Sequence, residues 1–235
     1  MAGSFDAVDV RVLGRRIAVR IWSPGESSLP LLIAHDGPEY DERAALTRCA
    51  GALVEREALP PFRIALVPPG ERDEWYSASA LYGRALCHKI VPALREQVEV
   101  AGLPVGLGAS LGALALLQAQ RAWPGSFAGL FLQSGSFFVP RHDRHESGFP
   151  RYRRIVRFVR GVLRAESHSD PVPVMMTCAS EEENIHNNRQ MAAALGAQGY
   201  GATLVEVPGG HDFESWGEAL QPSLTELLLR VWAPL

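Results

Sequence analysis

Two segments near the N-terminus alternate apolar and polar residues, whereas the apolar segments that follow are continuous. The alternating segments, DAVDVRVL and RIAVRIW, flank Gly14-Arg15, which is the pattern of two half-buried antiparallel strands joined by a turn. A continuous apolar run bounded by turn residues is typical of a strand that is buried on both faces. Such runs follow in the order LPLLIAH, FRIALVPP, LPVGLGA, FAGLFLQSGS, VPVMMTCA and GATLVEVP.

Helical patterns separate most of these runs. Helices are expected at about residues 44–57 and 79–98, and in the segments LGALALLQAQRAW, NIHNNRQMAAALGAQ and LTELLLRVW. Strands that alternate with helices predict an α/β fold with a mostly parallel, twisted sheet and helices on both faces. The N-terminal hairpin adds antiparallel strands to this sheet. Because no repeat or low-complexity linker interrupts the pattern, we expect a single domain over residues 1–235.

The segment 137–170, after the sixth strand, is too long for a simple connection, and we expect a small helical insertion there. Its second half, RYRRIVRFVRGVLR, has an apolar helical face and a face rich in arginine. We interpret it as an amphipathic helix with a solvated basic face, because charge runs usually lie on the surface. The alternative is a cap over the active site, in which these arginines meet an anionic substrate.

The composition is that of an ordinary globular protein, with 47% hydrophobic and 21% charged residues. A net charge of −3 gives no reason to expect nucleic acid or an anionic membrane as a partner. Cys49, Cys87 and Cys178 have no zinc-ligand spacing, so we expect buried, reduced thiols and no metal. The N-terminus lacks a signal-peptide pattern and no apolar run is long enough to cross a bilayer, so we expect a soluble, cytoplasmic protein. The oligomeric state is not indicated.

The strongest chemical signal is Gly108-Ala109-Ser110-Leu111-Gly112, a GxSxG motif between an expected buried strand and an expected helix. This context is typical of a nucleophile elbow, in which the serine lies on a tight strand-to-helix turn. A nucleotide-binding turn is the alternative, but neither GxGxxG nor GxxxxGK[ST] is present. Ser110 is therefore predicted to be the nucleophile of an α/β-hydrolase, a fold that commonly begins with an antiparallel hairpin.

A serine nucleophile needs a base and an acid, which follow it in the chain in the order acid and then histidine. His211 lies in VPGGHDFESW, at a late junction between a strand and a helix, and is predicted to be the base. The other histidines lie in polar stretches, within a helix or at the end of an early strand. The acid is expected after the strand VPVMMTCA, where Glu181, Glu182 and Glu183 are consecutive.

The chain resembles the esterase D and enterochelin esterase-like branch of the α/β-hydrolases. The matching stretches span about residues 31–220, and the more specific ones are HDGPEY and GGHDFESW. Carried over to this sequence, the resemblance selects Glu182 as the triad acid, with Glu183 as the fallback. It also implies supporting or substrate-binding roles for a group of residues outside the triad: Asp36, Glu39, Arg72, Glu74, Trp75 and Gln133.

The resemblance further implies an oxyanion hole with two donors. One is the amide of Leu111, which follows the nucleophile. The second is expected just beyond Asp36-Gly37, where Pro38 has no amide hydrogen. Gly37 or Glu39 is therefore expected to supply the donor.

These features predict a serine esterase that hydrolyses a small carboxylic ester or thioester through an acyl-enzyme, without a metal or another cofactor. An acyltransferase would use the same residues and admit an alcohol in place of water. A non-catalytic binding protein on the same fold is the third hypothesis. The identity of the acyl and alcohol parts is not indicated by the sequence.

Overall fold

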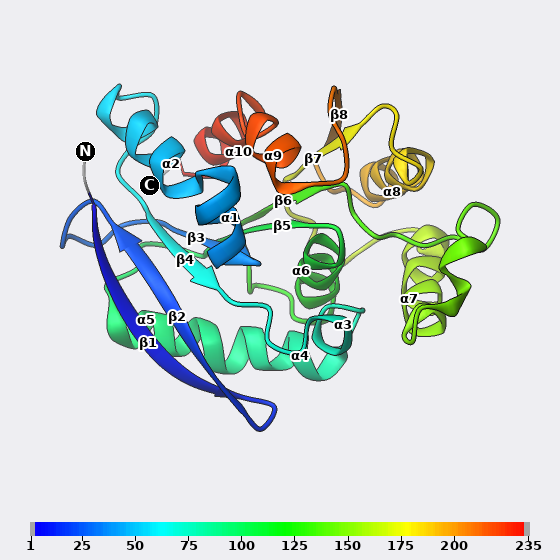
Figure 1. Cartoon of the computed structure of the whole chain (residues 1–235), viewed down its shortest axis with the longest axis horizontal. Coiled ribbons are helices and arrows are strands. Elements are labelled where there is room, and N and C mark those ends of the chain that lie inside the picture. The colour runs from blue at the N-terminus through cyan, green and yellow to red at the C-terminus, as the bar shows by residue number, and fades with distance from the viewer. Residues whose placement is uncertain (1–2, 233–235) are drawn as a thin grey trace.

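An eight-stranded sheet forms the centre of the protein in this computed structural model, which describes residues 3–232 (Figure 1). Its spatial order is β1-β2-β4-β3-β5-β6-β7-β8, and the six strands from β4 to β8 in this order run parallel to one another. The strands are β1 (Ser4–Val12), β2 (Arg15–Ser23), β3 (Leu31–His35), β4 (Arg63–Val67), β5 (Val105–Ala109), β6 (Gly129–Gln133), β7 (Val174–Ala179) and β8 (Ala202–Val207).

The predicted N-terminal hairpin is confirmed, with its turn one residue earlier than expected. Leu13 and Gly14 connect the strands, with φ values of 47° and 85°, so that Val12 pairs with Arg15. Two consecutive left-handed residues match the right-handed twist of a tight hairpin. β2 then pairs antiparallel with β4, which joins the hairpin to the parallel part of the sheet.

Helices cover both faces of the sheet, as the sequence predicts (Figure 1). One face carries α1 (Gly37–Ala44), α2 (Leu46–Glu55), α9 (Phe213–Glu218) and α10 (Ser223–Trp232). The other face is covered by α3 (Arg72–Trp75), α4 (Ala80–Ala85), a π-helical turn (Leu86–Ile90), α5 (Val91–Gln97), α6 (Leu111–Ala122), α7 (Tyr152–Arg164) and α8 (Ile185–Ala197).

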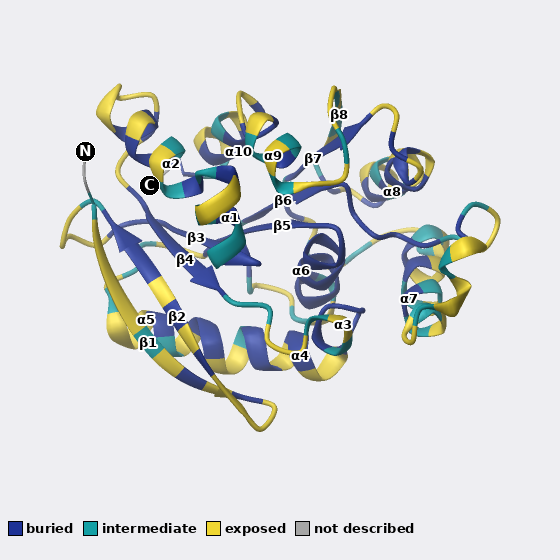
Figure 2. Ribbon diagram, in the orientation of Figure 1, coloured by how far each residue is buried: buried dark blue, intermediate teal, exposed yellow. Residues whose placement is uncertain are grey.

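Each face of the sheet has its own apolar core. Along β3, Leu31 and Ile33 pack into one core while Leu32 and Ala34 pack into the other. This alternation follows from the two-residue period of a strand. The central strands are therefore buried throughout, as Figure 2 shows, and their sequences are continuously apolar for that reason.

Two predicted helices differ from the structure. The helix expected at 44–57 is preceded by α1, and the left-handed backbone of Ala45 (φ 52°) separates α1 from α2. The helix expected at 79–98 contains a π-helical turn, in which the Val91 amide donates to the Leu86 carbonyl. Pro92 follows this turn and has no amide hydrogen for the His88 carbonyl, which accounts for the irregularity at this point.

The segment after β6 contains a 3₁₀ turn (His145–Gly148) and α7, which confirms a small helical insertion. The apolar face of α7 is buried through Ile155, Val159 and Val162. Its N-terminal end is tied to α3, because Arg154 binds the Glu74 carboxylate at 2.7 Å.

Among residues 3–232, no helix is both long enough and apolar enough to span a membrane.

Candidate active site

Ser110 lies at the turn between β5 and α6, at the carboxyl edge of the sheet. Its backbone has φ 55° and ψ −121°, a conformation that L-residues rarely adopt. The turn is tight enough that a Cβ on Gly108 would lie 2.7 Å from the carbonyl carbon of Gly112. Glycine at position 108 therefore allows α6 to begin directly behind the serine, as the GxSxG motif predicts.

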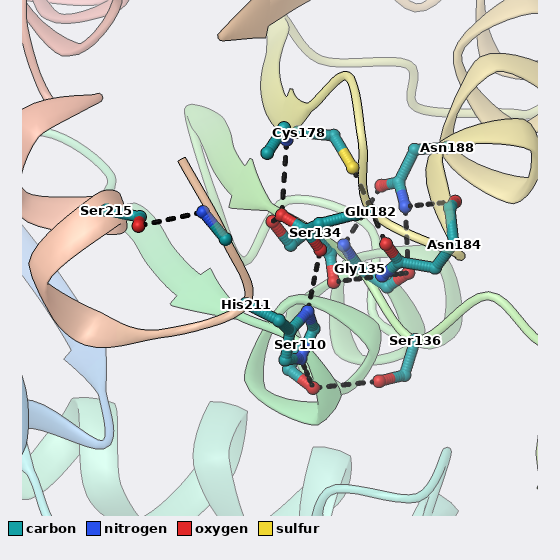
Figure 3. Close-up of polar contacts among 12 residues, drawn as sticks. Ser110, Ser134, Gly135, Ser136, Cys178, Glu182, Asn184, Asn188, His211 and Ser215 are labelled. Carbon is teal, nitrogen blue, oxygen red and sulfur yellow. Dashed lines mark hydrogen bonds and ion pairs between the residues drawn. The ribbon is translucent and has the colours of Figure 1, made fainter. Parts of the chain in front are cut away.

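His211 connects Ser110 to Glu182 through two hydrogen bonds (Figure 3). The distance from His211 Nδ1 to Glu182 Oε2 is 2.7 Å, and that from His211 Nε2 to Ser110 Oγ is 3.0 Å. A carboxylate accepts hydrogen bonds, so Nδ1 carries the proton and Nε2 is free to accept from the Ser110 hydroxyl. This arrangement can remove the serine proton during nucleophilic attack.

Glu182 is held by three hydrogen-bond donors of the protein. Its Oε1 accepts from Ser134 Oγ at 2.6 Å and from the Ala179 amide at 3.2 Å, while Oε2 accepts from His211. Burial raises the pKa of Glu182, but hydrogen bonds from His211 and Ser134 outweigh it and bring the pKa below the usual range. The carboxylate therefore stays ionised at neutral pH.

A second hydroxyl contacts Ser110. Ser136 Oγ lies 2.9 Å from Ser110 Oγ, and the Ser136 amide donates to the Ser110 carbonyl at 3.1 Å. Because the Ser110 hydroxyl donates to His211, the Ser136 hydroxyl is left to donate to Ser110 Oγ.

The residues after β6 were not predicted to belong to the site. Ser134 has a left-handed backbone (φ 46°), supports Glu182, and accepts a hydrogen bond from Trp216 Nε1 at 3.0 Å. One feature of the sequence could have indicated them: Ser134 and Ser136 come directly after a strand that is expected to lie beside the strand before Ser110. The carboxyl ends of neighbouring parallel strands meet at one edge of the sheet.

His35 supports the turn that carries Ser110. Its Nδ1 lies 3.1 Å from the Gly112 carbonyl, and its Nε2 lies 3.0 Å from the Tyr82 hydroxyl. The carbonyl can only accept, so Nδ1–H donates to it and Nε2 accepts from Tyr82. Complete burial lowers the pKa of His35 to about 4, and the imidazole is neutral at physiological pH.

The residues expected around the oxyanion are divided between two cavities that meet at Ser110. Leu111 lines the larger cavity, whereas Asp36 and Glu39 line the smaller one together with His211. Gly37 lines neither cavity. A Cβ at this position would lie 2.3 Å from the Leu66 Cα, so glycine is required there for close packing of α1 against β4.

Arg72 borders both cavities and is fixed by Asp36. Its Nε and one terminal nitrogen each lie 3.0 Å from a different oxygen of the Asp36 carboxylate. This paired geometry holds the guanidinium plane in one orientation beside Ser110.

Other candidates lie away from the reacting atoms. Glu183 is 78% exposed and pairs with His145 rather than with His211. Glu74 binds Arg151 and Arg154, and Trp75 is buried against Tyr82. The remaining candidate is Gln133, which is fully buried and bonds to Tyr40, Thr177 and the Trp216 carbonyl. Glu74, Trp75 and Gln133 support the scaffold around the site and do not border either cavity.

The cysteines of the described chain are free, but only Cys178 is buried; Cys49 and Cys87 are partly exposed. The expectation that all three are buried is therefore wrong. In the part of the chain that the structure describes, no group of three or more His, Cys, Asp or Glu side chains is arranged to hold a metal ion.

The larger cavity is a cleft of about 500 Å³ that opens beside Ser110 and His211. Its walls come from α3, from the loop after β6, and from the loops after β7 and β8. The described residues that line it include none from α7. The arginines of this helix therefore do not border the cleft, and the alternative in which they meet an anionic substrate has no support in the structure.

A comparison with protein families matches residues 11–227 to a family described as "Putative esterase". Among curated proteins, the chain is similar to two proteins named iron(III) enterobactin esterase, from the O6:H1 and K12 strains of Escherichia coli. The identities are 24% and 23% over 228 residues, which cover 92% of this chain. The matched region covers 54% of those proteins, so the chain spans about half the length of the curated relatives it matches.

Solved structures share the fold. An enterobactin esterase from Shigella flexneri superposes with a TM-score of 0.79 and 21% identity, over 100% of this chain and 60% of that one. A ferulic acid esterase has the same TM-score with 18% identity, and the match covers 98% of each chain. The predicted α/β-hydrolase fold is thereby confirmed.

Proposed function

Since the chain belongs to the family described as "Putative esterase", we propose that it is a serine hydrolase that cleaves small carboxylic esters through a triad of Ser110, His211 and Glu182. The observation that carries this proposal is the unbroken series of hydrogen bonds from Glu182 through His211 to Ser110. It lies beside an open cleft, where a substrate carbonyl can reach the serine.

In the first half of the reaction, Ser110 Oγ attacks the ester carbonyl while His211 Nε2 takes the hydroxyl proton. Glu182 keeps the imidazole in the required tautomer and stabilises the imidazolium that forms. The Leu111 amide, at the N-terminus of α6, is the proposed donor to the oxyanion. The same imidazolium then donates its proton to the departing alcohol, which leaves an acyl-enzyme at Ser110.

In the second half, water takes the place of the alcohol. His211 removes a proton from the water as it attacks the acyl carbon, and returns that proton to Ser110 Oγ when the acid leaves. An alcohol in place of water would give acyl transfer by the same steps. Product analysis with and without added alcohols decides between hydrolysis and transfer.

A fluorophosphonate probe tests the proposed nucleophile directly. We expect the wild-type protein to be labelled and Ser110→Ala to remain unlabelled, because the probe reacts with an activated serine. Ser169→Ala changes an exposed serine outside the cleft and should label like the wild type. An unlabelled wild type, or equal labelling of Ser110→Ala, would refute the proposal.

A further inference from the structure

Six of the side chains that line the catalytic cleft are carboxylates. Two of the acids that border it are engaged within the protein: Glu182 binds His211, and the buried Asp143 accepts hydrogen bonds from Asn187 and the Val139 amide. The other acidic side chains on its walls are Asp73, Glu146, Glu181 and Glu183. They come from three separate parts of the chain: α3, the loop after β6, and the loop after β7. The cleft is a ligand site on independent grounds, because Ser110 and His211 open into it.

The positive groups on these walls do not balance this charge. Arg72 is the guanidinium that borders the cleft, and it already has a bidentate partner in the Asp36 carboxylate. His145 lies between two of the acids, with Nε2 3.3 Å from Glu183 Oε2 and 3.7 Å from Glu146 Oε1. A cleft lined mainly by one sign of charge concentrates counter-ions of the opposite sign.

The cleft also contains aromatic surface. Phe138 and Phe149 line it, with their ring centroids 6.4 Å apart and their planes at 84°. Aromatic faces attract ammonium groups, and the attraction is greater where water is excluded. Carboxylates together with aromatic rings suit a positively charged group on an apolar body better than they suit an anion.

We propose that the preferred substrates are esters that carry a positively charged group, such as a quaternary or primary ammonium, which the acidic cleft beside Ser110 binds. This proposal rests on the proposed function, since it concerns the substrate of the same site. The acids Glu181, Glu183 and Asp73 then determine specificity, and they do not take part in bond making or breaking.

Matched esters test the charge preference. On the alcohol side, choline acetate is compared with its neutral isostere, 3,3-dimethylbutyl acetate. On the acyl side, p-nitrophenyl esters with trimethylammonium, tert-butyl and sulfonate termini are compared at equal chain length. We expect kcat/KM for the cationic member to exceed that of the neutral one by roughly tenfold or more in at least one series. The advantage should shrink as the NaCl concentration rises from about 0.02 M to about 0.5 M, because salt screens exposed charges.

Charge-neutralising variants connect the preference to the cleft. Glu181→Gln/Glu183→Gln, and separately Asp73→Asn, should each lower the cationic-to-neutral ratio of kcat/KM several-fold. The control Glu26→Gln/Glu96→Gln also removes two negative charges, but from exposed positions outside the cleft. It should leave the cationic-to-neutral ratio of kcat/KM as in the wild type.

Equal rates across the charge series, or a preference for the sulfonate, would overturn the proposal. So would a cationic preference that survives both sets of cleft variants. If neutral esters are hydrolysed without charge discrimination, only the substrate class is wrong. If no ester is hydrolysed and the fluorophosphonate probe fails to label Ser110, the proposed function itself is wrong and this inference falls with it.

Discussion

At the scale of single residues, Glu182 and Glu183 are neighbours in the sequence with different surroundings in the fold. Glu182 is buried and accepts hydrogen bonds from His211, Ser134 and the Ala179 amide. The side chain of Glu183 is 78% exposed and lies against His145. We therefore assign the proposed role of triad acid to Glu182, the carboxylate that the turn after β7 directs inward.

This difference gives a prediction for the two glutamates. Glu182→Gln should lower kcat for a neutral ester by about 10³- to 10⁴-fold, because the amide cannot hold His211 in the required tautomer or stabilise the imidazolium. Glu183→Gln should have a much smaller effect on the same substrate. Steady-state kinetics measure both, with circular dichroism as the check that each variant is folded. The opposite ranking would assign the acid to Glu183.

The candidate site residues that the structure brings together could be anticipated where a motif fixed their position. Ser110 follows from GxSxG, and His211 from its place after the last strand. The three consecutive glutamates could not be separated by pattern alone, since only the local turn decides which side chain is buried. Ser134 and Ser136 were not predicted, because they belong to no sequence motif. Their place beside Ser110 follows only once the order of the strands in the sheet is known.

At the scale of elements, α1 lies directly against β4, and Gly37 packs against the backbone of Leu66. The Cα of Leu66 occupies the space that a side chain at Gly37 would need. A methyl group there cannot be accommodated by a side-chain rotation, since the obstacle is the backbone of a central strand.

Two glycine-to-alanine substitutions should therefore have opposite effects. Gly37→Ala should lower the free energy of unfolding by about 2 kcal/mol or more, because α1 or β4 must move. Gly161→Ala, on the exposed side of α7 with open space around it, should raise it by about 0.5–1 kcal/mol through better helix propensity. Urea denaturation measures both. Equal effects of the same sign would contradict the packing argument.

The elements themselves were largely predictable from periodicity, and the exceptions have local causes. α1 was missed because GPEYDERA contains Gly and Pro and few apolar residues, so it shows no clear helical stripe. The π-helical turn before Pro92 was missed because the apolar positions on either side continue at helical intervals. Apolar residues four positions apart fit both an α-helical turn and a wider π-helical turn, so this spacing does not distinguish the two.

At the scale of the whole molecule, proton binding at His35 should be linked to folding. Burial lowers its pKa from 6.5 to about 4 in the folded state, so the unfolded chain binds this proton first as the pH falls. The free energy of unfolding should therefore fall as the pH decreases. The fall begins near pH 6.5, the pKa of the imidazole in the unfolded chain, and is complete near pH 4. A shift of this size corresponds to about 3 kcal/mol in order of magnitude.

The measurement is the free energy of unfolding between about pH 7 and pH 4 for the wild type and for His35→Asn. The variant should be less stable at neutral pH, because the Tyr82 hydroxyl loses its acceptor, and its stability should fall less steeply with acidity. Parallel pH profiles for the two proteins would show that His35 does not contribute to the acid sensitivity.

The arrangement of the whole sheet explains why distant parts of the sequence could be assigned to one site. The strands β3 to β8 are parallel, so the segments that follow them emerge at the same edge. Alternating strands and helices predict that edge from the sequence, but not the lining of the cleft. The charge of the cleft depends on how the loops after β6 and β7 face α3, and no periodic pattern encodes their orientation.

The backbone of Ser110 has a further consequence for anyone who engineers this protein. A conformation that suits glycine costs any other residue about 1–3 kcal/mol, and Ser110 adopts one at φ 55° and ψ −121°. Replacement by glycine would relieve that strain and remove the hydroxyl in the same step. A screen that selects only for thermal tolerance is therefore expected to favour variants that lack the proposed nucleophile. Under the proposed function, stability and activity place opposite demands on position 110, and such a screen needs an activity assay to retain the serine.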